Sequence, residues 1–175
     1  EPPTHELPMS ASNTGARPTT SPISPHASPA IPVDDSATAE RLRQSAFEAT
    51  VGQDGRVTAV DLRAKELETV DQVEEVFSAL ASLNRLKSIK GRGHGITNEA
   101  LARIAGLTEI VEIELVHTKL NDSAIDHLLR MTGLTSLNVS HSDVADEGVE
   151  KLTVFTEMTS LDLQSTNVTN QGMVA

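Results

Sequence analysis

The stretch "LTSLNVSHSDVADEGVEKLTVF", residues 134–155, decides the fold because the chain repeats its pattern. A shift of 24 residues forward gives "MTSLDLQSTNVTNQGMVA" from residue 158, and the same shift back gives "IVEIELVHTKLNDSAIDHLLRM" from residue 110. A further shift back reaches residue 86, and an earlier copy starts at residue 57 after a connection about five residues longer. Such a period is typical of arrays in which each unit packs on its neighbours.

Each unit has the pattern of a short strand followed by a short helix. Side chains alternate between the two faces of a strand, and the predicted inward position at each strand centre is apolar: Val60, Ile89, Ile113, Leu137 and Leu161. Apolar residues at helical spacing follow. Polar residues just before these helical stretches are predicted to be N-caps: Asn98, Asp122, Asp146 and Asn170. One unit cannot bury its apolar face alone, so the units are expected to stack.

This unit resembles the leucine-rich repeat family, especially its ribonuclease-inhibitor-like and cysteine-containing branches with short bacterial repeats. Thr118, Ser142 and Thr166 fall where many relatives carry Asn or Cys. The resemblance covers residues 57–175 and implies an α/β solenoid, with a curved parallel sheet on the concave side and short helices on the convex side. The fifth unit stops at Ala175 before its helix, as expected for a fragment or for an open end.

The chain before the repeats divides into two parts. All eight prolines lie within the first 32 residues, mixed with Ser, Thr and Ala. This composition predicts a disordered tether over residues 1–35. A docking site for a proline-reading domain is the alternative, but no basic residue stands beside a clean PxxP pattern.

Residues 36–56 are predicted to form an N-terminal helix that caps the array. Asp35 or Ser36 is the expected N-cap, and Leu42, Ala46 and Phe47 are expected on the buried face. Gly52 and Gly55 are expected to end the helix before the first repeat strand.

The glycine-rich stretch "KGRGHG", residues 90–95, lies at the end of the second repeat strand. It is neither a Walker loop, since no G-K-[ST] follows, nor a dinucleotide fingerprint, since the glycines are spaced G-x-G-x-G. Gly91 replaces a core Leu, which predicts a distorted second unit. Lys90 and Arg92 are expected to form a local basic spot on the strand side.

Composition excludes several functional classes. A net charge of −11 argues against binding a nucleic-acid backbone, and the absence of Trp and Tyr argues against base stacking. The absence of Cys excludes disulfides, thiolate metal sites and cysteine nucleophiles. No apolar run approaches the roughly 20 residues of a membrane span. We therefore expect no nucleic acid, no cofactor and no transmembrane segment in this chain.

Two residue pairs are candidates for chemical sites. His117 and His141 are one period apart, so they are expected on neighbouring strands. They could bind a metal or sense pH, but no third ligand is evident, and exposed histidines in a polar column are the favoured interpretation. Glu112 and Glu114 could support acid–base catalysis only in a pocket that separates their pKa values. We therefore predict a solvated acidic strip and no catalytic or metal site.

The outward strand positions form the candidate partner-binding surface. Extended concave faces are the usual binding surfaces of such arrays, so a protein partner is expected. The predicted partner-binding residues are Asp61, Arg63, Lys90, Arg92, Glu112, Glu114, His117, Asn138, His141, Asp162 and Gln164. Val116, Ser88, Ser136 and Ser160 flank them. The last strand is an edge on which another copy of the chain could pair.

The favoured hypothesis is a non-enzymatic protein-interaction module on a tether, associated with a bacterial envelope. The resemblance leaves two alternatives: an intracellular regulatory or substrate-reading arm, of the kind that serves ubiquitin ligases and cyclases, and a targeting arm of an enzyme whose catalytic domain lies elsewhere. The compartment is left open, with an extracytoplasmic setting favoured over a cytoplasmic one.

Overall fold

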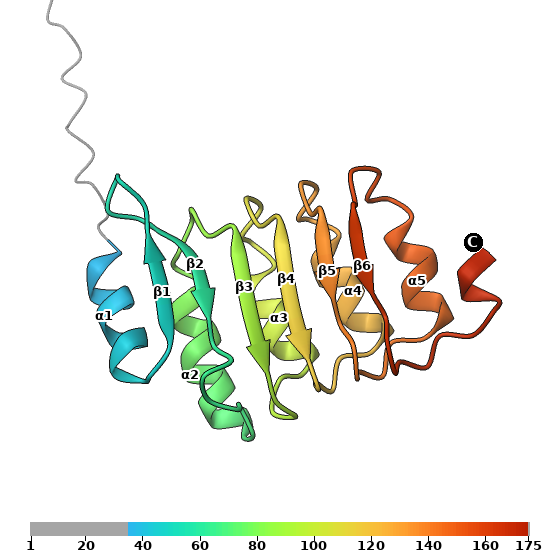
Figure 1. Cartoon of the computed structure of the whole chain (residues 1–175), viewed down its shortest axis with the longest axis horizontal. Helices are drawn as coiled ribbons and strands as arrows, with labels where there is room; N and C mark the ends of the chain where they lie inside the picture. The colour runs from blue at the N-terminus through green and yellow to red at the C-terminus, as the bar shows by residue number, and fades with distance from the viewer. Residues whose placement is uncertain (1–34, 175) are drawn as a thin grey trace, which may run out of the picture. The chain divides into compact units, whose positions relative to one another are not determined.

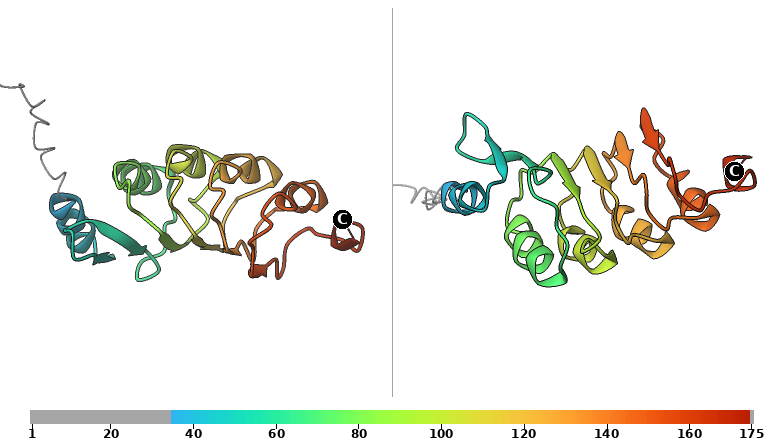
Figure 2. Two further views of the ribbon diagram at one scale, coloured as in Figure 1. Left: turned by 90° about the horizontal axis from the view of Figure 1, so that it is seen from above. Right: turned by 60° about the horizontal axis from the view of Figure 1, so that its bottom comes forward.

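The computed structural model describes residues 35–174, which belong to one structural unit. Figures 1 and 2 show two layers in this unit, with a sheet on one side and the helices of the repeats on the other. The predicted tether, residues 1–35, lies outside the described residues except for its last position. The α/β solenoid predicted from the repeat is confirmed.

The sheet has six strands in chain order, and β2 to β6 are parallel to one another. The strands are β1 (Glu48–Val51), β2 (Val57–Asp61), β3 (Ser88–Arg92), β4 (Glu112–Val116), β5 (Ser136–Asn138) and β6 (Ser160–Asp162). The helices are α1 (Ser36–Gln44), α2 (Val70–Leu80), α3 (Asn98–Ile104), α4 (Asp122–Leu128), α5 (Asp146–Leu152) and the 3-10 turn η1 (Gly172–Val174).

The predicted strand centres are in register across the sheet. Val60, Ile89, Ile113, Leu137 and Leu161 pair in that order from β2 to β6. The first four are 0–1% exposed, because each is covered by the next unit and by the helices, whereas Leu161 on the last strand is 43% exposed. Burial of this column therefore depends on a following neighbour, as stacking of repeats requires.

The N-terminal segment differs from the prediction of a single helix. α1 ends at Gln44, and β1 follows as a strand antiparallel to β2. Leu42 and Phe47 are buried as predicted, but Ala46 is exposed and has a φ of 67°, a left-handed conformation that breaks the helix. The predicted amphipathic helix was therefore wrong after residue 44.

Asp35 holds this segment against the first repeat. Asp35 is the N-cap of α1, but its side chain does not cap the helix. The buried carboxylate instead accepts a hydrogen bond from the backbone N–H of Val57, at 3.0 Å, where β2 begins.

Three of the four predicted N-caps, Asn98, Asp122 and Asp146, were wrong by one residue. The N-caps are Thr97, Asn121 and Ala145. The three residues predicted as caps are the first helical residues, and their side chains accept hydrogen bonds from backbone N–H groups one repeat further on. The three bonds are Asn121 N to Asn98 Oδ1 (3.2 Å), Ala145 N to Asp122 Oδ1 (2.7 Å) and Thr169 N to Asp146 Oδ1 (2.7 Å). These polar residues therefore join consecutive repeats.

The glycine-rich turn is ordered by a neighbouring loop, and the predicted distortion of the second unit was wrong. β3 keeps its register through Gly91, which pairs with Leu115. Gly93 has a φ of 130°, and a Cβ placed there would lie 2.3 Å from the carbonyl oxygen of Leu67. A Cβ on Gly95 would lie 2.7 Å from the same oxygen. The glycines therefore allow the longer connection of the first unit, residues 63–69, to pack its backbone against the turn.

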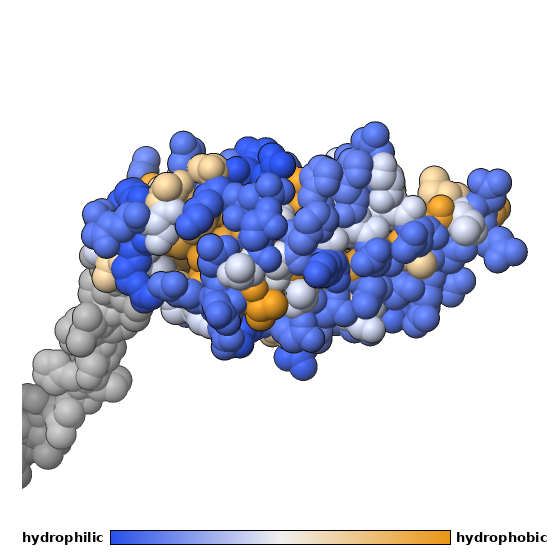
Figure 3. Space-filling view, turned by 90° about the horizontal axis from the view of Figure 1, so that it is seen from below, coloured by the Kyte–Doolittle hydropathy of each residue, from blue (hydrophilic) through white to orange (hydrophobic). Residues whose placement is uncertain are grey.

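None of the helices in residues 35–174 is long and apolar enough to span a membrane. In Figure 3 the surface seen is mainly hydrophilic, with hydrophobic residues gathered in patches that include the C-terminal end. Exposed apolar side chains near that end are Val154, Leu161, Met173 and Val174.

Candidate functional site

The outward side chains of β2–β6, together with the residues that directly follow these strands, form one surface, here called the strand face. Its central row runs across the whole array in register, as predicted, and consists of Asp61, Lys90, Glu114, Asn138 and Asp162. Neighbouring strands are about 4.8 Å apart. Residues that lie up to 101 positions apart in the sequence are thus placed side by side on a rigid sheet.

Arg63 connects the first unit of the strand face to the third. Its guanidinium contacts the Asp61 carboxylate at 2.6 Å and the Glu114 carboxylate on β4 at 2.9 Å. The hydrogen bond from Arg63 lowers the pKa of Asp61, and the same bond raises the pKa of Arg63. Since Arg63 uses Nε and both terminal nitrogens in these bonds, it is held in one orientation.

Lys90 and Ser88 both contact the predicted acidic strip of Glu112 and Glu114. The Lys90 ammonium lies 2.9 Å from Glu112 and 3.9 Å from Glu114, and the Ser88 hydroxyl donates to Glu112 at 2.6 Å. The hydrogen bonds from Ser88 and Lys90 lower the pKa of Glu112. Lys90, predicted as part of a basic spot, therefore pairs with the predicted acidic strip, whereas Arg92 pairs with Glu66 instead.

Arg92 keeps part of its bonding capacity free. Its Nη2 lies 3.4 Å from the Glu66 carboxylate, on the loop that packs against the glycine-rich turn. Within the described residues, no other hydrogen bond or ion pair of its guanidinium is found, and 44% of its side chain is exposed. Arg92 is therefore the cation of the strand face that is most accessible to a partner.

The half of the strand face formed by β5 and β6 is organised by amide and hydroxyl groups. Asn138 donates to Asp162 at 3.3 Å and accepts from the backbone N–H of Ser140. Asp162 accepts from the backbone N–H of Gln164 in the same way. Asp162 is the sole charged group of this half among the described residues, so the half offers mainly uncharged hydrogen-bonding groups.

His117 and His141 lie side by side, as predicted. Their rings stack with centroids 4.2 Å apart and an interplanar angle of 8°. Both have positive φ values, 53° and 56°, and occupy the repeat position where the second unit has Gly93 and the fifth has Ser165. No cluster of three potential metal ligands is found among the described residues. The pair therefore adds a flat aromatic element to the strand face.

The strand face is an open surface lined by polar side chains. Its carboxylates have pKa values that are lowered where a shift is found, whereas a general acid at neutral pH needs a raised value. The hollows on this face are open, and the largest measures about 550 Å³ beside Arg63 and Arg92. The contacts of Ser88 with Glu112 and of Glu66 with Arg92 were not predictable from the sequence, because pairing of side chains depends on rotamers as well as on the repeat register.

Two segments of the chain, residues 131–152 and 156–175, match the family model of the leucine-rich repeat. These two segments are leucine-rich repeats. The matched segments include β5, α5 and β6, which carry the uncharged half of the strand face. A comparison with curated protein sequences finds no match.

Several solved structures are similar to this chain at low sequence identity. They include internalin C2 from Listeria monocytogenes (16% identity, TM-score 0.47), an internalin, inlF, from the same organism (17%, 0.43) and TLR13 in a complex with ssRNA13 (16%, 0.38). The alignments cover 63%, 67% and 61% of this chain. They span 53%, 44% and 14% of the respective solved chains, so this chain represents about half or less of each.

The lowered pKa of Glu112 predicts a pH-dependent contribution to stability. This contribution is fully present above the ordinary pKa of 4.5 and is lost as the pH falls through the lower value in the folded state. We expect Glu112→Gln to reduce the free energy of unfolding at pH 7 by at most about 0.5 kcal/mol, since the pair is partly exposed. The difference from the wild type should shrink in acid.

Urea unfolding followed by circular dichroism, repeated from pH 7 down to pH 3, measures this difference. Glu150→Gln is the matched substitution, because Glu150 is exposed and its side chain makes no ion pair among the described residues. A Glu112→Gln deficit that stays constant into acid would contradict the expected role of the ionised carboxylate.

Proposed function

We propose that this leucine-rich repeat chain is a non-enzymatic module that binds a protein partner through its strand face. The observation that supports this most strongly is the continuous row of polar side chains from β2 to β6, none of which is covered by another described segment. A rigid, extended and polar surface favours a protein or peptide partner over a small molecule, which is usually bound in a deep apolar pocket.

The two halves of the strand face provide different contributions to binding. The charged residues around Arg63 and Lys90 already pair with one another, so they supply shape and fixed dipoles more than free charge. Arg92 and the uncharged groups of β5 and β6 retain the capacity to bond a partner. We therefore infer moderate affinity for a polar partner, anchored at Arg92 and extended over Asn138 and Gln164.

We further propose an extracytoplasmic setting at a bacterial envelope. This proposal is supported by the Pro-, Ser- and Thr-rich composition of residues 1–35 and by the resemblance of the repeat to short bacterial repeats.

The test of strand-face binding uses two exposed residues from opposite ends of the face. The variant carries Arg92→Glu and Gln164→Arg, which leave the ion pairs of Arg63 and Lys90 and the core intact but remove the contact between Arg92 and Glu66. A matched control carries Arg130→Glu and Asn84→Arg, two exposed residues outside the strand face with the same total change in charge. The bait is the full chain, and the captured proteins from extracts of the source cells are quantified by mass spectrometry.

We expect at least one protein to bind the wild type and the control equally and to bind the strand-face variant about tenfold less, which corresponds to about 1.4 kcal/mol. Equal capture by all three baits would contradict recognition through the strand face. Capture lost equally with the variant and the control would show that net charge, not this surface, determines binding.

A further inference from the structure

Two segments depart from the regular repeat, and they pack against each other. The first unit has a connection about five residues longer than the others, and the second unit carries the glycine-rich turn. The loop that makes the first departure, residues 63–69, donates from Leu67 N to Arg92 O at 2.9 Å and accepts at Leu67 O from Gly95 N at 2.8 Å. The glycine-rich turn therefore holds the loop of residues 63–69 in place through two backbone hydrogen bonds. Neither segment is part of the regular repeat.

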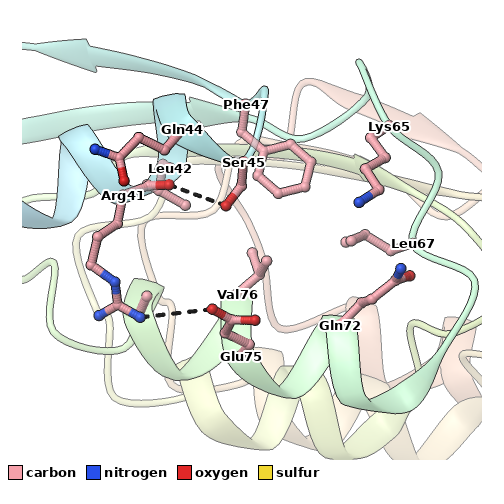
Figure 4. Close-up of a pocket in the computed structure, with 11 residues that line it drawn as sticks. Arg41, Leu42, Gln44, Ser45, Phe47, Lys65, Leu67, Gln72, Glu75 and Val76 are labelled. Atoms are coloured by element: carbon pink, nitrogen blue, oxygen red, sulfur yellow. Dashed lines mark hydrogen bonds and ion pairs between the residues drawn. The ribbon is translucent and has the colours of Figure 1, made fainter.

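The fixed loop forms one side of a cavity beside the N-terminal helix. The cavity lies between α1, residues 63–69 and α2, and has a volume of about 220 Å³. Leu42, Phe47, Leu67 and Val76 form its apolar lining and are themselves buried in the core. Figure 4 shows the Phe47 ring and Val76 on opposite sides of the open space.

The rim of this cavity carries a cation that has no partner within residues 35–174. Lys65 makes no hydrogen bond or ion pair with the other described residues. In Figure 4 its ammonium points toward the cavity beside Leu67, on the same side as the Gln72 amide. Across the cavity, Arg41 and Glu75 pair with each other at 4.0 Å, so their charges largely cancel. The rim is thus cationic by one charge in a chain whose net charge is −11.

The size of the cavity and the charge at its rim indicate the size and charge of a ligand that would fit it. A volume of about 220 Å³ corresponds to roughly seven non-hydrogen atoms, at about 30 Å³ each. This is smaller than the roughly 300 Å³ at which pockets for drug-sized molecules begin. A leucine side chain and a carboxylate together contain about seven such atoms, and an apolar lining beneath an unpaired ammonium is complementary to that combination.

We propose that this cavity binds a leucine-sized apolar residue at the C-terminus of a partner polypeptide. The side chain enters the space between Phe47 and Val76, and the terminal carboxylate accepts hydrogen bonds from Lys65 and the Gln72 amide. This site is separate from the strand face, so it can hold the end of a partner whether or not strand-face recognition exists.

The test uses N-acetyl-leucine, which presents both the side chain and a free carboxylate, added to the isotope-labelled full chain. Amide chemical shifts in NMR spectra are expected to change saturably at residues 41–47, 65–69 and 72–79, with a dissociation constant on the order of millimolar. N-acetyl-leucine amide, which lacks the charge, should bind about fivefold more weakly, as should N-acetyl-leucine to Lys65→Gln. Lys87→Gln is the matched control, since Lys87 is exposed and remote from the cavity.

A second variant tests the proposal independently of Lys65→Gln, in case that substitution unfolds the loop of residues 63–69. Ala79 lines the cavity and is only half-buried, so Ala79→Leu should fill the space and abolish the shifts without disrupting α2. Ala102→Leu, on the exposed side of α3, is its control. Shifts that persist in Ala79→Leu, or equal binding of the acid and its amide, would overturn the proposal, and neither result bears on the strand face.

Discussion

Replacing Gly93 with alanine is expected to lower the free energy of unfolding by about 3 kcal/mol. Gly93 has a φ of 130°, which residues with a Cβ rarely adopt, and the added Cβ would lie 2.3 Å from Leu67 O and 2.5 Å from Leu67 N. Both contacts are with backbone, so no side-chain rotation relieves them. The loop must move away from the turn and lose its hydrogen bonds to Arg92 and Gly95.

Urea unfolding monitored by circular dichroism is the appropriate measurement, because the chain has neither Trp nor Tyr for fluorescence. Gly106→Ala is the matched control, since a Cβ at Gly106 would meet no heavy atom within 4 Å. Its effect should stay within about 0.5 kcal/mol. Similar losses in both variants would show that the Gly93 turn is not constrained by the loop.

The repeat made the fold predictable because its physical requirements recur in every unit. Ile113 and Leu137 align one period apart, and both are buried at the strand centres. Predictions from the sequence were wrong where one local pattern of residues is compatible with two different structures. Asp122 is a good N-cap by residue type, but a shift of one position allows its carboxylate to reach the next repeat at Ala145. Sequence spacing does not distinguish a bond within one helix from a bond between units.

The sequence predicted which residues lie on the strand face, but not which of their charged side chains pair with each other. The period placed Lys90 and Glu114 in one row, which the register confirms. The pairing of Arg63 with Glu114, 51 positions away, depends on the conformation of the residue that follows β2, which the repeat does not specify. The cavity between α1, residues 63–69 and α2 was missed for a similar reason. Its only sequence signal was the longer connection before residue 86, whose path is determined by its packing against the glycine-rich turn.

Leu137 and Leu161 provide a second large and well-controlled prediction, because they occupy the same column in consecutive units. Leu137→Ala is expected to lower the free energy of unfolding by about 3 kcal/mol, since the side chain is 1% exposed and its removal leaves a cavity in the stacked core. Leu161→Ala should lower it by about 1 kcal/mol, since 43% of Leu161 is already exposed.

The comparison tests whether stability comes from contacts between neighbouring units. Arrays of repeats can unfold in parts, so urea unfolding by circular dichroism is combined with amide hydrogen exchange, which reports each unit separately. Leu137→Ala should increase exchange in β4 and β6, the strands that pair with β5, whereas Leu161→Ala should act mainly on β6. Equal losses of stability in the two variants would show that each strand is stabilised within its own unit. The strand face, whose polar row is placed in register by stacking, would then not be stabilised by contacts between neighbouring units.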